Sequence, residues 1–202
     1  MAVEWESGFT RGGFLLKFLL ATLVGVGLGL DSNLMAYEQA YPMTEPGVCE
    51  IKTLPEGVIL RARTDGGYFR ENNGLFRKLF ETIQRNQIPM TTPVEAGIQP
   101  GSMVFYLDPA SSKRQDLNLV GGVERKEVAK RTVASIGIRG GYSRESFEQN
   151  QARLREWMQQ QQDWEPAGEA YAVYWNSPFM IWFLKRSEVH LPLRPRGTGS
   201  GK

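Results

Sequence analysis

The chain has 202 residues, enough for one domain or two small ones with a buried core. Its 24 Lys and Arg residues nearly balance its 22 Asp and Glu residues, so no global basic surface exists for nucleic acid, and we expect no nucleic-acid partner. The single cysteine, Cys49, excludes an intrachain disulfide, a Cys-based zinc site and a CxxC redox pair. The single histidine, His190, excludes a two-histidine metal site within one chain, and we expect no metal site built from side chains.

The N-terminal segment, residues 1–36, contains an uncharged apolar run, Phe18–Leu30, which follows Arg11 and Lys17. Its thirteen residues suit the apolar region of a signal peptide, whereas a membrane span needs roughly 20. Counting back to Phe14 gives a marginal membrane anchor, because a lysine at the edge can snorkel. A cleaved signal, a retained anchor and a buried core helix remain open. The first two predict an exported domain, extracytoplasmic or tethered to the membrane and facing outside the cytoplasm, because positive charge precedes the run.

The first half of the remaining chain predicts a strand, a helix and two further strands. The strand Val48–Thr64 alternates in polarity, and Asn72–Asn86 places apolar residues at helical spacing. The strands Val94–Gln99 and Ser102–Leu107 are joined by a Pro-Gly turn.

The second half repeats this order. We expect strand Val123–Ile138, helix Ser143–Gln161 and strands Ala170–Trp175 and Trp182–Leu193, followed by a flexible tail at 195–202. A repeated unit need not bury its core alone, and the pattern predicts an α+β domain with two helices on antiparallel sheet.

Two segments resemble signatures of one known family. Ile88–Val94 (IPMTTPV) cannot be helical, because its two prolines fix the backbone in extended geometry. It resembles the Ile-Pro-Met-Thr-Ala-Pro-Val signature of the SOUL/haem-binding protein family, with Thr92 in place of the usual Ala. Ala172–Phe179 (AVYWNSPF), followed by Lys185–Val189 (KRSEV), resembles the Tyr-Asn-x-Pro-Phe … Arg-Arg-Asn-Glu-Val close of that family. The likeness extends over about residues 37–193.

The resemblance implies a fold and a function for residues 37–194. The fold is a pair of βαββ units with pseudo-twofold symmetry, forming a distorted antiparallel barrel flanked by two helices, as in GyrI-like domains. The function is non-covalent binding of haem or a related tetrapyrrole in an apolar cleft between the first helix and a late loop, without a shared axial histidine. We expect a monomeric carrier, buffer or sensor without catalytic residues.

The ligand site predicted in this way combines cations with apolar side chains. A tetrapyrrole needs an apolar slot and positive charges for its propionates. The run SPFMIWF at 177–183 is more apolar than a solvent loop requires, whereas for most apolar residues of the first helix ordinary core is the favoured interpretation. The candidate residues are Arg77, Lys78, Phe80, Phe179, Met180, Trp182, Lys185 and Glu188.

Period-two alternation in the last strand separates an apolar face from a polar one. It groups Glu188 and His190 with Arg186, opposite the aliphatic residues. We therefore expect His190 to be solvated, with an axial haem ligand as the alternative. Glu188 is either an exposed ion pair or a carboxylate that faces a ligand cleft, since GyrI-like domains often place a glutamate against cationic ligands.

Two other functions remain open. One is an enzyme that acts on small electrophiles or on a tetrapyrrole, with Glu188 as base and Trp175 or Tyr174 as cleft wall. The other is a structural or interaction module with an empty cleft.

Overall fold

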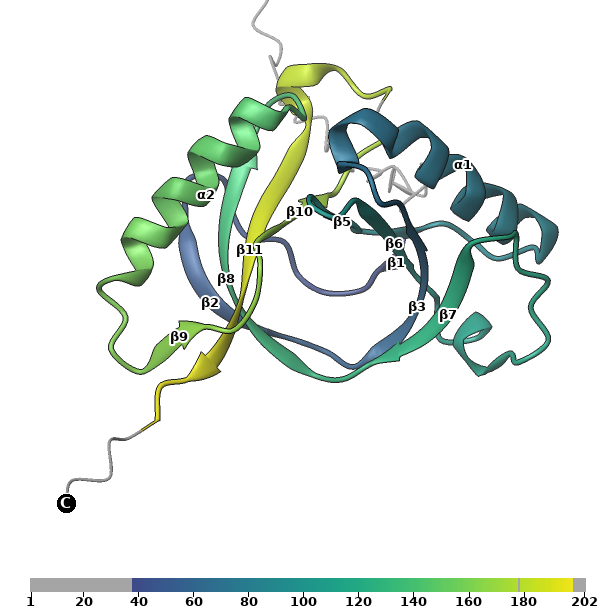
Figure 1. Cartoon of the computed structure of the whole chain (residues 1–202), viewed down its shortest axis with the longest axis horizontal. Coiled ribbons are helices and arrows are strands. Elements are labelled where there is room, and N and C mark those ends of the chain that lie inside the picture. The colour runs from purple at the N-terminus through teal and green to yellow at the C-terminus, as the bar shows by residue number, and fades with distance from the viewer. Residues whose placement is uncertain (1–37, 178, 198–202) are drawn as a thin grey trace, which may run out of the picture. The chain divides into compact units, whose positions relative to one another are not determined.

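The structure, a computed structural model, describes residues 38–177 and 179–197. A nine-stranded antiparallel sheet curls strongly, and two long helices lie against its outer side (Figure 1). The strands are β1 (Glu38–Gln39), β2 (Cys49–Leu54), β3 (Gly57–Arg63), β4 (Thr91–Thr92), β5 (Val94–Gly97), β6 (Ser102–Tyr106), β7 (Val123–Val128), β8 (Arg131–Arg139), β9 (Trp164–Pro166), β10 (Tyr171–Tyr174) and β11 (Arg186–Pro195). The helices are α1 (Tyr68–Arg85) and α2 (Arg144–Met158), with short 3-10 turns η1 (Ser111–Lys113) and η2 (Trp182–Leu184). Strands β1 and β4 form a separate parallel pair.

Eight strands of the sheet, together with the helices, form two copies of one unit, and β9 pairs with β11 beside them. The first copy comprises β2, β3, α1, β5 and β6, and the second comprises β7, β8, α2, β10 and β11. The strand order β2-β8-β11-β10-β5-β6-β3-β7 is unchanged when it is reversed and the two copies are exchanged. The predicted duplicated α+β fold with pseudo-twofold symmetry is therefore confirmed.

Each predicted long strand is in fact two strands. The segment Val48–Thr64 breaks after β2, at Pro55, which lacks a backbone N–H and fixes its own φ. The segment Val123–Ile138 also breaks, at Ala129 and Lys130 between β7 and β8, although no proline stands there. The reason lies in the pairing, because β2 pairs with β8 and β7 pairs with β3, so in each copy the first strand joins the sheet half of the other copy. Each unit is thus ββαββ rather than βαββ.

The last predicted strand, Trp182–Leu193, also differs from the structure. Its first residues form η2, and β11 begins at Arg186. The apolar residues before Arg186 lack the alternation of a half-buried strand. The sequence therefore does not indicate where the strand begins.

Both predicted helices are confirmed, with shifted ends. Leu75, Leu79 and Ile83 form the buried stripe of α1, which begins four residues earlier than predicted. Helix α2 follows Ser143, whose side chain accepts a hydrogen bond from the backbone N–H of Ser146 at 3.1 Å.

The sheet is buried on both faces. The outer face packs its apolar side chains, among them Leu60, Phe105 and Ile136, into the core beneath the helices. The inner face surrounds a smaller cluster that includes Tyr41 and Trp175. The segment 40–47 crosses the inside of the curve, so the inner face is covered by the chain itself (Figure 1).

No helix among the described residues is both long and apolar enough to cross a membrane. The predicted signal or anchor, 1–36, lies outside the described residues, as do residues 198–202 of the predicted tail.

Candidate functional site

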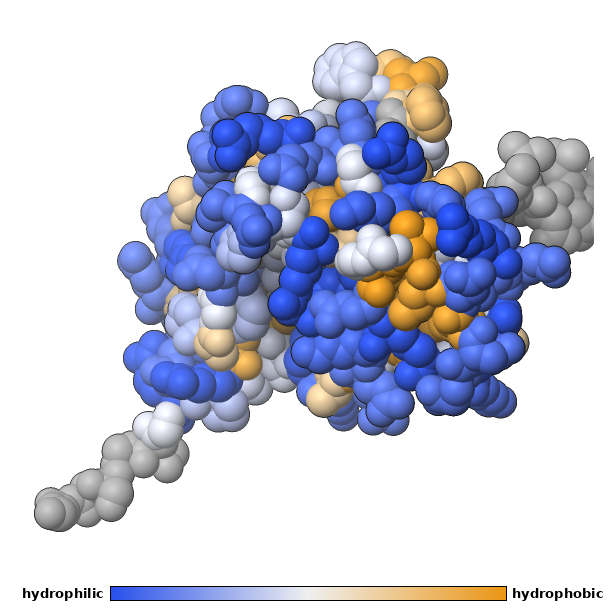
Figure 2. Space-filling model, turned by 45° about the vertical axis from the view of Figure 1, so that its right-hand side comes forward, coloured by the Kyte–Doolittle hydropathy of each residue, from blue (hydrophilic) through white to orange (hydrophobic). Residues whose placement is uncertain are grey.

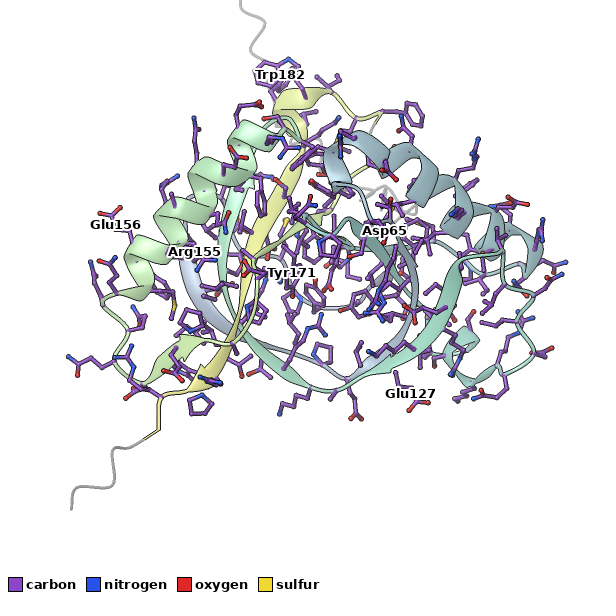
Figure 3. The ribbon with its side chains drawn as sticks, viewed as in Figure 1. Asp65, Glu127, Arg155, Glu156, Tyr171 and Trp182 are labelled. Atoms are coloured by element: carbon purple, nitrogen blue, oxygen red, sulfur yellow. The ribbon has the colours of Figure 1, made fainter. Side chains whose placement is uncertain are left out.

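The connection between β10 and β11 carries a protruding apolar surface, residues 179–184, which we call the apolar loop. Each of its six side chains is at least 38% exposed, and Phe179 reaches 95%. Hydrophobic side chains gather at the top of the molecule in Figure 2, where Figure 3 labels Trp182. The base of the loop is fixed, because the N–H of Arg186 donates to Asn176 Oδ1 at 2.6 Å and the Tyr142 hydroxyl donates to the Arg186 carbonyl at 2.9 Å. Contiguous exposed apolar surface of this kind marks a binding surface.

A chain of aromatic contacts links the loop to the first turn of α1. The Lys185 ammonium lies 5.0 Å from the centre of the Tyr142 ring, which contacts Tyr174 at 4.4 Å. Tyr174 in turn stacks on Tyr68, the first residue of α1, at 5.9 Å between ring centres. The predicted cation Lys185 therefore contacts Tyr142, the first ring of the series that ends at Tyr68.

The other predicted residues of α1 lie further along the helix. Phe80 is 41% exposed and stacks on Phe76 with ring centres 5.6 Å apart. Arg77 is exposed, and Lys78 is half-buried at the wall of a shallow recess. At 1.5 Å per residue, Phe80 lies about 18 Å along the axis from Tyr68. The predicted α1 residues and the apolar loop thus form two neighbouring surfaces rather than one closed slot.

Glu188, the remaining predicted ligand residue, lies apart from both surfaces. Its side chain is wholly buried on the inner face of the sheet. Five residues surround its carboxylate: the Thr44 N–H and Trp175 Nε1 donate to Oε1 at 2.7 and 2.8 Å, and Lys52, Ser135 and His190 contact Oε2 at 2.7, 2.8 and 2.5 Å. Burial alone would raise the pKa of this carboxyl, but His190 and Lys52 outweigh it and lower the pKa to about 2. Glu188 is therefore an ionised group saturated by its own protein.

The expectation that His190 is solvated is wrong. Its side chain is fully buried, with Nε2 against Glu188 and Nδ1 3.1 Å from the Tyr171 hydroxyl. Burial lowers its pKa, so the ring is neutral, donates from Nε2 and accepts at Nδ1 from Tyr171. Alternation placed His190 correctly on the face of Glu188. It could not indicate that segment 40–47 covers this face.

A second polar cluster on the inner face was not found by sequence reasoning. Glu95 Oε1 accepts hydrogen bonds from the hydroxyls of Tyr41 and Tyr106 at 2.7 and 2.8 Å and from Arg131 Nη2 at 2.7 Å. Burial and the neighbouring Glu95 raise the pKa of Tyr41, which keeps this hydroxyl protonated as a donor. The only available signal was a glutamate in an otherwise apolar strand directly after Pro93, and nothing in the sequence pairs it with Arg131.

A cavity of about 650 Å³ opens beside this cluster. Arg61, Glu95, Arg131 and Tyr171 contribute polar groups to its wall, and Phe147 of α2 lies among its apolar side chains. Figure 3 places Tyr171 in the middle of the molecule, far from Trp182. As far as the described residues go, none of the eight predicted ligand residues lines this cavity.

The described residues contain no group of three or more His, Cys, Asp or Glu side chains that could hold a metal ion.

Comparison with known proteins gives one family and a fold. The model of the family described as "SOUL heme-binding protein" matches residues 37–192, and no curated protein matches the chain significantly. Among solved structures, the EcmrR chain of a DNA complex is similar with a TM-score of 0.57 at 12% identity, covering 73% of this chain and 57% of that one. The EcmrR C-terminal domain gives 0.53 at 11% identity, covering 73% and 97%. An uncharacterized conserved protein from Listeria innocua gives 0.54 at 14% identity, covering 75% and 94%. At these identities the likeness shows the α+β fold alone.

Proposed function

Because the chain belongs to the SOUL heme-binding protein family, we propose that it binds haem or a related tetrapyrrole non-covalently, as a carrier, buffer or sensor without catalysis of its own. The observation that carries this proposal is the apolar loop, whose six side chains remain exposed although its base is fixed by hydrogen bonds. A planar apolar ligand that covers this surface removes it from water, and each square ångström so buried contributes about 25 cal/mol.

The positive charges near the apolar loop suit the propionates of a tetrapyrrole. A tetrapyrrole such as haem carries propionates, and Lys185, which directly follows the apolar loop, lies over the Tyr142 ring at 5.0 Å. Arg77 and Lys78 offer further cations along the same helix. Bound haem supplies a redox-active iron and a strong Soret absorption. The apolar loop and the cations near it suit the macrocycle and the propionates of haem rather than its iron.

Axial ligation by His190 has no support in the geometry. Both ring nitrogens are occupied, by Glu188 and by Tyr171, and the ring is fully buried. The affinity is therefore expected to come from apolar contact and propionate pairing.

The geometry also gives no support to Glu188 as a catalytic base. A carboxylate whose pKa is lowered to about 2, and whose oxygens already accept hydrogen bonds, binds protons too weakly for that role. If the domain is instead a structural or interaction module with an empty cleft, no saturable tetrapyrrole binding is expected.

A hemin titration of the full-length chain tests the proposal. We expect a Soret shift that saturates, and an affinity at least about tenfold lower in Trp182→Asp, because a carboxylate under an apolar ligand loses its solvation. Val48→Asp is the matched control, since Val48 is an exposed hydrophobic residue, 45% accessible, outside the loop. No saturable shift, or equal losses in both variants, would contradict the proposal.

We further propose that the domain is exported. This rests on the apolar run 18–30 and the positive charges before it. Protease protection of fractionated native cells measures the side of the membrane on which residues 37–194 lie. A full-length chain found in the cytosol would exclude export.

A further inference from the structure

The apolar loop projects from the body of the domain. Figure 2 shows hydrophobic side chains standing above the polar surface at the top of the molecule, and the exposed fractions of Phe179 and Trp182 are 95% and 67%. A rigid planar ligand laid on such a projection covers one side of it, whereas a lipid bilayer covers it on every side. The shape of the loop therefore suits a bilayer as well as a tetrapyrrole.

The composition of the loop suits the boundary between headgroups and acyl chains. Its six residues are far too few to cross a bilayer, which takes about 20 residues of helix. Tryptophan is enriched at the headgroup level of membranes, because its ring is apolar and its N–H is polar. Trp182 lies between Ile181 and Phe183, which are also exposed. This pattern favours shallow insertion.

The loop satisfies part of its own backbone. Within η2 the Leu184 N–H donates to the Ile181 carbonyl at 3.0 Å. The Lys185 N–H donates to the Trp182 carbonyl at 3.2 Å. A backbone donor that leaves water without an acceptor is costly, and membranes admit polar backbone only where it is paired internally. These bonds reduce the cost of moving the loop out of water.

Positive side chains lie at the base of the loop. Lys185 and Arg186 directly follow it, and Arg139, which is exposed, is the residue opposite Arg186 in the pairing of β8 with β11. Among the described residues no carboxylate forms an ion pair with either arginine. The start of α2, residues 144–148, carries one arginine and two glutamates and so offsets one of the three charges. The remaining positive charge complements anionic lipid headgroups.

We propose that the apolar loop docks the domain on a bilayer that contains anionic phospholipid. The loop inserts into the interfacial region, and Arg139, Lys185 and Arg186 face the headgroup phosphates. A retained N-terminal anchor, one of the predictions for residues 1–36, would hold the domain beside such a surface. Docking goes beyond tetrapyrrole binding and is measured without hemin, so the two proposals can fail separately.

Tryptophan quenching in the full-length chain tests where the loop lies. The chain is reconstituted into vesicles of phosphatidylcholine and phosphatidylglycerol whose acyl chains carry bromine, which quenches tryptophans that lie in the bilayer. We expect Trp182→Phe to lower this quenching at least about twofold, because Trp182 is the tryptophan at the interface. Trp164→Phe is the matched control, since Trp164 pairs with Pro195 at the other end of β11. Equal quenching in the unmodified chain and in Trp182→Phe would overturn the proposal.

A pair of charge variants tests the headgroup contact. In Arg139→Gln, insertion of Trp182 should be about fivefold weaker at low salt, because each cation near an anionic surface contributes about that factor. Lys130→Gln removes an exposed cation about 30 Å away along the same strand and should change nothing. Equal effects of the two variants, or quenching that is independent of phosphatidylglycerol, would overturn the proposal. Self-association without lipid that Trp182→Asp abolishes would overturn it too, because a second copy would then cover the loop.

Discussion

The apolar loop and the Glu188 network are neighbours in the chain and opposites in chemistry. Leu184 is half exposed, whereas Glu188, four residues later, is a fully buried carboxylate. The buried charge has a complete structural explanation, because Lys52 and four further residues hold it. The exposed apolar run has none within the described chain. Exposure without a structural reason is therefore the better guide to a ligand surface here than buried charge.

The largest expected effect is on stability, and it comes from replacing Glu188. It tests whether this residue is structural or binds the ligand. Glu188→Gln leaves Lys52 without its anion, and breaking a buried pair should lower the free energy of unfolding by about 3 kcal/mol. Glu165→Gln, which breaks the exposed pair with Arg194, should cost less than about 1 kcal/mol. Urea denaturation measures both. A stable Glu188→Gln variant with weakened hemin binding would show instead that Glu188 is the ligand residue that the sequence predicted.

Lowering the pH should destabilise the folded protein through Glu188 and His190 of the inner network. Both pKa values, of Glu188 and of His190, are lowered in the folded state, so the unfolded chain binds more protons and stability rises with pH. The His190 contribution is lost as the pH falls below its unfolded value near 6.5, and the Glu188 contribution as the pH falls from about 4.5 towards 2.

The melting temperature measured from pH 8 to pH 3 checks this order. It should be flat at the upper end and should fall below about pH 6.5. His190→Ala should flatten the decline between pH 6.5 and 5. An unchanged slope in that variant would mean that His190 is protonated in the native state.

Removing Lys185 should have an intermediate effect on the ligand surface. Lys185→Gln is expected to weaken hemin binding by a few-fold at low salt and by less at high salt, because a propionate pair at the surface is screened. Hemin titrations at two salt concentrations measure this difference. Lys126→Gln, which removes an exposed cation of β7, is the control, and a salt-independent loss would argue against propionate pairing.

The smallest expected effect on hemin binding is that of His190→Ala. Its folded fraction should bind hemin with less than about a threefold change, under roughly 0.7 kcal/mol, because the ring lies inside the sheet. A hemin titration followed by the Soret absorption measures this affinity. If this variant alone abolishes the shift while Trp182→Asp retains it, the iron is held by His190 and the loop model is wrong.

The fold was largely predictable, because its signals are local. Leu75, Leu79 and Ile83 recur at helical spacing, and the prolines of 89–93 exclude a helix, so both helices and most strands were found. The breaks between β2 and β3 and between β7 and β8 were missed, since alternation continues through a change of partner strand.

The inner face was less predictable, because its contacts join distant residues. Thr44 meets Glu188 across 144 positions, and Arg131 meets Glu95 across 36. Period-two alternation tells which residues share a face but not what covers that face. His190 was therefore assigned to solvent although its neighbours on the face were correct.

The exchange of edge strands between the two copies constrains how the molecule can be divided. Strand β2 completes the sheet of the second copy and β7 completes that of the first, so a single copy on its own would leave one strand without a partner and a sheet edge unpaired. Two separate copies would satisfy each other by the same exchange around a twofold axis. The single polypeptide therefore has the arrangement of a symmetric dimer. If the connection between Tyr106 and Val123 were cut, strand pairing between the two copies would still hold the fragments together.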